Sequence, residues 1–306
     1  MHDIVRSQVF LVKVIVMRRF AQLLALLPAI ARAEPPALPH FPYEVIEVPG
    51  TEAVAAWERL RAEGNGTPII VGSAEDLVRL VELAIPTWVE KPGPAPEDVL
   101  KLAATLDHPR SLFDLRQIEL RQAIEYLRPE RDDLEAQLDE AIQNGDEATA
   151  NVLRDVLESL DAPPGPPEIG DWPDAPVAHA NALLSLDDWE TGRPFDKVYL
   201  VLLPTDDPAE TPAYLRLGGW NAHPPAAYHV AAFRAWADRY GAVPMLINAD
   251  VIEFRVARPP QDRDAAIALA LEQYEYCPDN VDQGTGSVAA FAATLLGNSY
   301  WYFWWD

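Results

Sequence analysis

Cysteine and basic residues are scarce in this chain of 306 residues, which has a single cysteine, Cys277. One thiol excludes a disulfide within the chain and a zinc site built from several cysteines. The chain has only 24 lysine and arginine residues but 48 aspartate and glutamate residues, which gives a formal net charge of −24. Such a surface repels phosphate backbones, so we expect no direct binding to nucleic acid. An acidic surface of this kind suits solubility, a basic partner or a cationic ligand.

Long hydrophobic runs are also missing, and the longest apolar stretch lies close to the N-terminus. Arg18 and Arg19 precede the apolar run Phe20–Ile30, and Ala31-Arg32-Ala33 has the A-x-A pattern of a cleavage site. This pattern predicts a signal peptide over residues 1–33, with Met17 as the initiating residue. The mature chain would then be periplasmic or secreted, with no integral membrane segment; without the signal it would be cytoplasmic. The alternative to a signal peptide is an amphipathic N-terminal helix.

Residues 34–89 form the first part of the mature chain, and their pattern predicts a β-α-β-α unit. Strands are expected over 43–48 and 67–72, because short apolar runs there end at glycine or proline. Val54, Trp57 and Leu60 recur at helical spacing between the two strands, and Thr51 is a candidate cap. Ser73 with Asp76 has the pattern of a capping box and opens the second helix.

Residues 90–176 combine two proline-rich linkers with an acidic helical segment from about Glu97 to Leu160. Pro109 and Pro129 divide this segment, and Asn144-Gly145-Asp146 joins a C-cap glycine to an N-cap aspartate. We expect an antiparallel helical hairpin whose acidic outer face is solvated. A partner-binding insertion is the alternative. The second linker, 161–176, is expected to be extended and exposed.

Residues 177–306 are expected to form a sheet domain that ends in an aromatic strand. The expected elements are strands over 197–204 and 212–220, a helix over 224–240, a hairpin of strands 242–248 and 251–257, and helices over 264–276 and 287–296. In the final run, Trp301, Phe303 and Trp305 share one strand face, and Tyr302 and Trp304 share the other. Because both faces are aromatic, we expect burial on both sides; lining a pocket is the alternative role for these rings.

Four motifs of this last part are "LLPTDDPAETPAYLRLGGWN", "YGAVPMLINADVIEFRVARPP", "EQYEYCPDNVDQG" and "WYFWWD". Together they resemble the bacterial domain of unknown function 4253, over about residues 195–306. That family has no assigned activity, so the resemblance implies an α+β domain and no catalytic residue. Its members are mostly intracellular, from which the apparent signal peptide departs.

Candidate catalytic residues are few. Cys277 would need a base, for which His223 and His229 are the nearest histidines, although a cysteine before proline at a helix end is more often a small buried residue. Asp279 and Glu253 are candidate acids, and Glu253 is the more unusual because it lies inside an apolar strand. No metal-binding or nucleotide-binding motif is present, so we expect no metal and no cofactor.

Candidate binding residues gather at the turn before helix 224–240 and at the end of the sheet domain. In the turn, two glycines permit unusual backbone angles, and Asn221 is a candidate helix cap. A plain structural turn is the alternative. The full set of candidate binding residues is Gly218, Gly219, Trp220, Asn221, Asp250, Tyr276, Trp304 and Asp306.

These observations predict an α+β protein with a mixed sheet flanked by helices and an acidic helical insertion. Three functions stay open. The first is a non-catalytic binding protein whose acidic surface recognises a basic protein, for example an immunity-type protein that blocks a basic toxin. The second is a hydrolase that uses Cys277 or carboxylates with His223. The third is a structural, envelope-associated protein.

Overall fold

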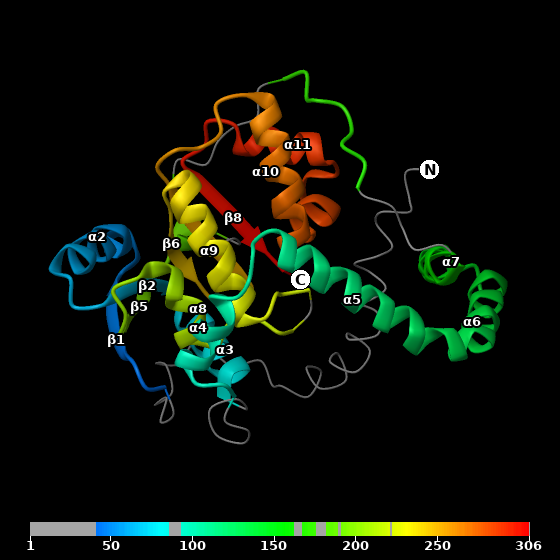
Figure 1. Ribbon diagram of the computed structural model, residues 1–306, viewed down its shortest axis with the longest axis horizontal. Coiled ribbons are helices and arrows are strands. Elements are labelled where there is room, and N and C mark those ends of the chain that lie inside the picture. Colours follow the sequence, from blue (N-terminus) through cyan, green and yellow to red (C-terminus); the bar gives the residue numbers. More distant parts are fainter. Residues whose placement is uncertain are drawn as a thin grey trace.

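A computed structural model describes residues 41–85, 93–161, 167–175, 182–188, 191–220 and 222–305. The expected signal peptide lies outside these residues, as do the candidate binding residues Asn221 and Asp306. The chain is a mixed α/β structure in which one six-stranded sheet has the order β1-β5-β2-β6-β7-β8 (Figure 1). Its strands are β1 (Glu44–Pro49), β2 (Thr67–Gly72), β5 (Lys197–Leu203), β6 (Ala242–Ile247), β7 (Val251–Val256) and β8 (Tyr300–Trp304).

The helices follow the order of the sequence. They are α2 (Ala53–Glu63), α3 (Ala74–Ile85), α4 (Pro96–Ala103), α5 (Arg110–Leu127), α6 (Arg131–Gln143), α7 (Glu147–Asp161), α8 (Thr211–Leu215), α9 (Ala226–Tyr240), α10 (Arg263–Tyr276) and α11 (Val288–Leu295). Shorter helical turns are η1 (Gly50–Glu52), η3 (Arg128–Glu130), η4 (Leu184–Leu186), η5 (Pro208–Glu210) and η6 (Asn280–Thr285), and a small ribbon pairs β3 (Asp187–Asp188) with β4 (Arg193–Pro194).

The two halves of the chain share the sheet, because β5 pairs with both β1 and β2 in antiparallel fashion. β2 is in turn parallel to β6. The N-terminal β-α-β-α portion and the C-terminal strands therefore form one continuous sheet. The helical segment 93–161 lies between these two parts of the sheet in the sequence.

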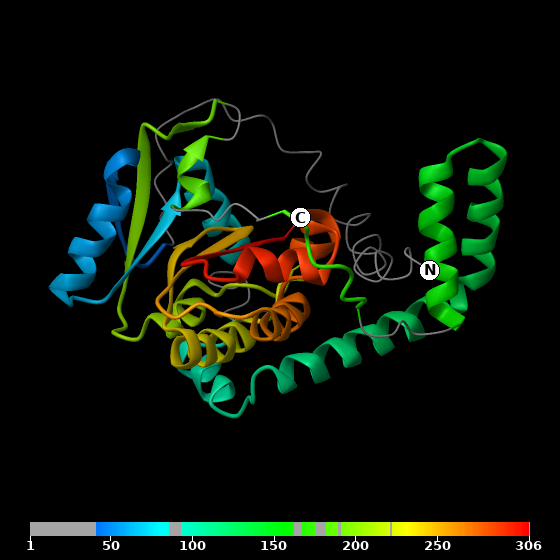
Figure 2. The same ribbon diagram turned by 90° about the horizontal axis from the view of Figure 1, so that it is seen from above.

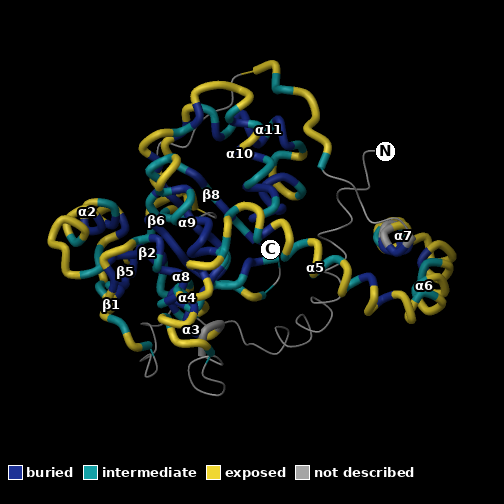
Figure 3. The backbone as a smooth tube through the Cα atoms, in the orientation of Figure 1, coloured by how far each residue is buried: buried dark blue, intermediate teal, exposed yellow. Residues whose placement is uncertain are grey.

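The two faces of the sheet carry separate apolar cores. On one face, helices α3, α9, α10 and α11 pack over side chains such as Val201, Phe254 and Phe303. On the other face, α2 packs Trp57 over Leu200 and Met245. The central strands β5, β2, β6 and β7 lie between these layers and are mostly buried, whereas the edge strand β1 is largely exposed (Figure 3).

Local signals in the sequence explain several helix ends. The expected capping box forms, since the Ser73 backbone N–H donates to the Asp76 carboxylate at 2.7 Å and the Asp76 N–H donates to Ser73 Oγ at 3.3 Å. Ser287 caps α11 with its hydroxyl, which accepts from the Ala290 N–H, and Gly64 ends α2 with a φ of 68°. Thr51, by contrast, lies within η1 and does not cap α2, which shows no side-chain cap.

The expected helical hairpin is present, and it extends away from the sheet at the end of α5 (Figure 2). We call helices α6 and α7 the acidic arm. Its apolar residues pack on one another and on the end of α5, in clusters that include Leu127, Leu153 and Leu157. The arm thus has a small core of its own.

The expected strand over 212–220 is wrong. Residues 211–215 form helix α8, and the described residues between its end and Pro225, 216–220 and 222–224, form no regular element. Pro212 lies at the first turn of α8, where a missing N–H costs nothing, and it cannot donate to a sheet ladder. The apolar pattern of this segment reflects packing of a short helix against α9.

One further expectation needs correction. β8 is an edge strand, with Trp301, Phe303 and Trp305 buried but Tyr302 and Trp304 only half-buried, because the second face is less covered there. The described residues 167–175 of the second linker are extended and mostly exposed, as expected, and they contact the C-terminal part of the chain. There the Ala289 N–H donates to the Ile169 carbonyl at 2.7 Å.

Candidate functional site

A tight turn between α8 and α9 leads to two buried histidines. Gly218 and Gly219 have φ values of 88° and 81°, which favour glycine. A Cβ atom at Gly218 would lie 1.8 Å from the Pro224 carbonyl oxygen and 2.8 Å from His229 Nε2. Glycine is therefore required at Gly218, because any side chain there would collide with the backbone just before α9.

The two histidines form a buried hydrogen-bonded chain with a tyrosine. His223 Nδ1 lies 2.7 Å from His229 Nε2, and His229 Nδ1 lies 2.5 Å from the Tyr276 hydroxyl. His223 belongs to the turn, His229 to the first turns of α9 and Tyr276 to the last turn of α10. We call these three residues the His–His–Tyr chain.

Burial keeps the three side chains of the His–His–Tyr chain uncharged. It lowers the pKa of His223 well below its usual value, and the neighbouring His229 and the Arg116 guanidinium add to this effect. Burial also lowers the pKa of His229 to about 3, again with a contribution from Arg116. The pKa of Tyr276 is raised by burial. Both imidazoles and the phenol are therefore neutral at physiological pH.

Two tryptophans flank His223. The Trp305 ring stacks on its imidazole with ring centroids 3.9 Å apart, and the Trp220 ring lies at 4.8 Å in a tilted orientation. The backbone of Trp305 is fixed by a hydrogen bond, since the backbone N–H of Trp305 donates to the Asp250 carbonyl at 3.0 Å. Trp220 is half-buried, whereas Trp305 is buried.

Arg116, from α5, connects this cluster to the helical insertion. Its guanidinium donates to the backbone carbonyls of Ala222 at 2.6 Å and Glu275 at 3.0 Å. It also contacts the Tyr276 carbonyl at 3.4 Å. The Arg116 side chain thereby joins the first half of α5 to the turn before His223 and to the C-terminal end of α10. The carbonyl groups at that end of a helix carry partial negative charge, which favours a cation there.

Cys277 lies beside this cluster but has a different set of partners. Its thiol donates to the Trp304 carbonyl at 3.0 Å, and Asn280 Oδ1 lies 3.6 Å from the sulfur. Burial and the nearby Asp279 carboxylate raise the pKa of the thiol. The Asn280 amide meanwhile donates to the Tyr302 carbonyl at 2.6 Å. Cys277 and Asn280 thus cap the outer edge of β8.

The other candidate residues take structural positions. Both carboxylate oxygens of Glu253 accept backbone N–H groups, from Leu184 at 2.8 Å and Ser185 at 2.9 Å. Burial raises the pKa of Glu253, as its place inside an apolar strand led us to expect. Buried Asp279 accepts a hydrogen bond from Gln283 at 3.1 Å. The carboxylate of Asp250 pairs with Arg79.

The structure therefore brings together only part of the candidate set. Gly218, Trp220, His223 and Tyr276 converge, whereas no hydrogen bond within the described residues joins His223 to Cys277, Asp279 or Glu253. Sequence reasoning missed the role of Trp305 beside His223. It also missed Arg116, which lies more than a hundred residues from Ala222 in the sequence and carries no local signal.

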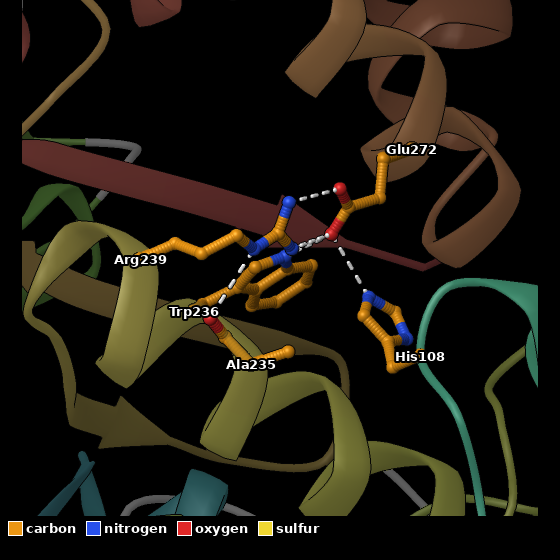
Figure 4. Close-up of polar contacts among 5 residues, drawn as sticks. All are labelled: His108, Ala235, Trp236, Arg239 and Glu272. Atoms are coloured by element: carbon orange, nitrogen blue, oxygen red, sulfur yellow. Dashed lines mark hydrogen bonds and ion pairs between the residues drawn. The ribbon is translucent and has the colours of Figure 1, made fainter.

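A second polar cluster surrounds Glu272 of α10 (Figure 4). Its carboxylate accepts from the Trp236 indole at 2.6 Å, from His108 Nε2 at 3.0 Å and from both Nη atoms of Arg239. Burial by itself raises the pKa of Glu272, but the hydrogen bonds from His108 and Arg239 outweigh it and lower the pKa to about 2. This saturated cluster joins α9, α10 and the loop before α5.

The described residues show no group of three histidine, cysteine or acidic side chains that is arranged to hold a metal. Among the same residues, none of the helices combines the length and the apolar character needed for a membrane crossing.

Residues 199–306 match the family model described as "Domain of unknown function (DUF4253)". The matched part runs from β5 to the end of β8, so it contains the His–His–Tyr chain, Trp220 and Trp305. Arg116, His108 and the acidic arm lie outside it. No curated protein and no solved structure was found to match the chain.

Proposed function

We propose that this protein is a non-catalytic binding protein and that its acidic arm recognises a basic protein partner. The observation that supports the proposal most directly is the charge of the arm. From the start of α6 to the end of α7, residues 131–161 contain ten carboxylates and two arginines. The exposed carboxylates belong to Asp132, Asp133, Glu135, Asp139, Glu140, Asp146, Glu147 and Glu158.

The shape of the arm adds to this argument. Its helices bury a small core and extend from the rest of the protein at the end of α5 (Figure 2). Like charges on neighbouring helical turns repel one another and cost stability. A cationic partner would relieve that repulsion, and complementary charge would speed its association. An immunity-type protein that blocks a basic toxin is the specific form of this proposal.

The geometry gives the hydrolase alternative little support. A nucleophilic cysteine needs a thiolate with a base in reach. The Cys277 thiol is buried, its pKa is raised, and it donates to a backbone carbonyl. The described contacts of His223 lead to His229 and not to the sulfur.

The test compares the full chain with two variants of equal charge. The arm variant carries Asp132→Asn, Asp133→Asn, Asp139→Asn and Glu140→Gln; the control variant carries Glu44→Gln, Glu52→Gln, Asp196→Asn and Asp238→Asn, at exposed positions outside the arm. Proteins captured by each are identified by mass spectrometry. The best candidate is then purified and its affinity measured over a range of salt concentrations.

The proposal expects a basic partner that binds the full chain and the control variant but binds the arm variant at least about tenfold more weakly. Its affinity should fall as the salt concentration rises, because exposed charges are screened. Equal binding by the arm and control variants would refute the role of the arm. An acidic partner, or a partner whose affinity does not change with salt concentration, would refute the proposal that binding is electrostatic.

A further inference from the structure

Two buried nitrogen atoms in the candidate site have no hydrogen-bond partner among the described residues. They are Nε2 of His223 and Nε1 of Trp305, whose residues are 3% and 1% exposed. Leaving a buried donor or acceptor unpaired destabilises the folded state, because the group has lost its hydrogen bonds to water. Two such atoms on rings stacked 3.9 Å apart call for an explanation.

The hydrogen-bonded chain shows that His223 Nε2 is a donor. The Tyr276 hydroxyl is buried, and its hydrogen-bond partner is His229 Nδ1, so the hydroxyl donates and Nδ1 accepts. A neutral imidazole that accepts at Nδ1 carries its hydrogen at Nε2, so His229 donates to His223 Nδ1. By the same rule His223 carries its hydrogen at Nε2, which is the unpaired atom.

The second unpaired atom is a donor as well, since an indole nitrogen only donates. Two N–H groups without an acceptor therefore lie on stacked rings. The guanidinium of Arg116 contributes positive charge nearby, because it donates to the carbonyl of Ala222, the residue before His223. The surroundings thus favour an oxygen acceptor that carries negative charge.

We propose that His223 and Trp305 bind the carboxylate of a small molecule, beside the turn at Gly218–Trp220. A carboxylate offers two acceptor oxygens, which matches two N–H donors. A monoanion is favoured over phosphate because both donors are neutral groups and each nitrogen of Arg116 already donates to a backbone carbonyl or to Glu119. The net charge of −24 also disfavours a dianion.

The surroundings suit a small ligand. Gly219 is exposed and Trp220 half-buried, so the turn beside His223 reaches the surface. Among the described residues, the aromatic rings of Trp220, His229 and Trp305 contact the His223 imidazole. The site lies within residues 199–306, apart from the acidic arm, so its test does not depend on the proposed partner binding.

The experiment follows the indole N–H signals of the full chain by NMR during titration with sodium acetate, with sodium chloride of equal ionic strength as reference. Trp301 is an internal control, since its buried Nε1 is also unpaired but its ring does not stack on a histidine. Acetamide serves as the uncharged analogue of acetate, and inorganic phosphate as the dianion. Trp305→Phe assigns the signal and removes one donor while keeping an aromatic ring.

We expect acetate to shift the Trp305 signal and the His223 Nε2 signal in a saturable way, while Trp301 stays unchanged. Acetamide and phosphate should bind at least about tenfold more weakly, and Trp305→Phe should weaken acetate binding about tenfold, as read from His223. No saturable shift at Trp305, or equal shifts at Trp305 and Trp301, would overturn the proposal. Stronger binding of phosphate than of acetate would overturn the choice of a monocarboxylate.

Discussion

The thiol of Cys277 donates a hydrogen bond to the backbone carbonyl of Trp304 at 3.0 Å. Trp304 belongs to β8, the strand at one edge of the sheet, and its carbonyl points away from β7 towards the segment after α10. Asn280 caps the Tyr302 carbonyl of the same strand. Side chains after α10 therefore take the place of a neighbouring strand and protect an edge that would otherwise be open to pairing.

The first prediction concerns the reactivity of Cys277. Because the thiol is buried, hydrogen-bonded and has a raised pKa, it should not react with a thiol reagent such as dithionitrobenzoate in the folded protein at neutral pH. It should react fully after unfolding in guanidinium chloride. The chain has no other cysteine, so the assay reports this thiol alone. Reaction of the folded protein at the rate of free cysteine would show that the thiol is accessible.

The second prediction concerns stability at acidic pH. The pKa of Glu272 is lowered to about 2 in the folded protein, against about 4.3 in an unfolded chain. Its carboxylate therefore contributes stability above the unfolded pKa, and this contribution is lost as the pH falls from about 5 to about 2. The loss should amount to about 2–3 kcal/mol.

Urea unfolding of the wild type and of Glu272→Gln at several pH values measures this contribution. The variant should be less stable at neutral pH, and the difference from the wild type should shrink as the pH falls. Asp264→Asn, an exposed position on the same helix, controls for the loss of one negative charge. A constant difference between wild type and Glu272→Gln across this pH range would contradict the prediction.

A third prediction follows from Glu253, which holds the turn at Leu184–Leu186 by two backbone N–H groups. Glu253→Ala removes both acceptors, so the amides of Leu184 and Ser185 should exchange with deuterium at least about tenfold faster. Hydrogen exchange read by NMR tests this effect. The amide of Phe254, the next residue in the same strand β7, should stay protected, and equal loss there would mean that the sheet itself has been destabilised.

The fourth prediction tests the direction of the His–His–Tyr chain. Tyr276→Phe removes the hydroxyl that donates to His229 Nδ1 and should lower stability by about 1–2 kcal/mol. In the wild type, nitrogen chemical shifts should show a hydrogen at Nε2 and none at Nδ1 for both His223 and His229. In the variant this preference should weaken. A wild type in which His223 carries its hydrogen at Nδ1 would refute the assignment.

The fifth prediction concerns the independence of the acidic arm. Leu157 belongs to the small core shared by α7 and the end of α5. Leu157→Ala should cost about 2–4 kcal/mol within the arm, so amides of α6 and α7 should exchange faster. Amides of β5 in the central sheet should keep their protection. Equal acceleration in β5 would show that the arm and the sheet unfold as one unit.

Much of the fold could be predicted because its signals are local. The Asn144-Gly145-Asp146 junction shows why: Gly145 has a φ of 71°, and Asp146 accepts from the Thr149 N–H at 3.1 Å. The hairpin between β6 and β7 is equally local, since Asn248 Oδ1 accepts the N–H groups of Asp250 and Val251. In both cases neighbouring residues satisfy the backbone without help from distant parts of the chain.

The predictions that were wrong, and the site residues that were missed, depend on contacts between residues far apart in the sequence. The segment 212–220 reads as a strand by its apolar residues, but its proline and its contacts with α9 make it a short helix and a turn. In the candidate site, residues of the turn and the end of α10 could be chosen from composition and spacing. The stacking of Trp305 on His223 could not, because it depends on where β8 ends relative to α9.

The sequence by itself determined the acidic charge, the caps and periodicities of the helices, and the resemblance of the last third to one domain family. Only the tertiary structure decided that β1 and β2 join the C-terminal strands in one sheet, that Arg116 reaches Ala222, and that Cys277 caps an edge. The physical reason is the separation in sequence between the residues that interact. Caps and helical faces are set by neighbours a few residues away, whereas these pairings arise when the whole apolar surface is buried at once.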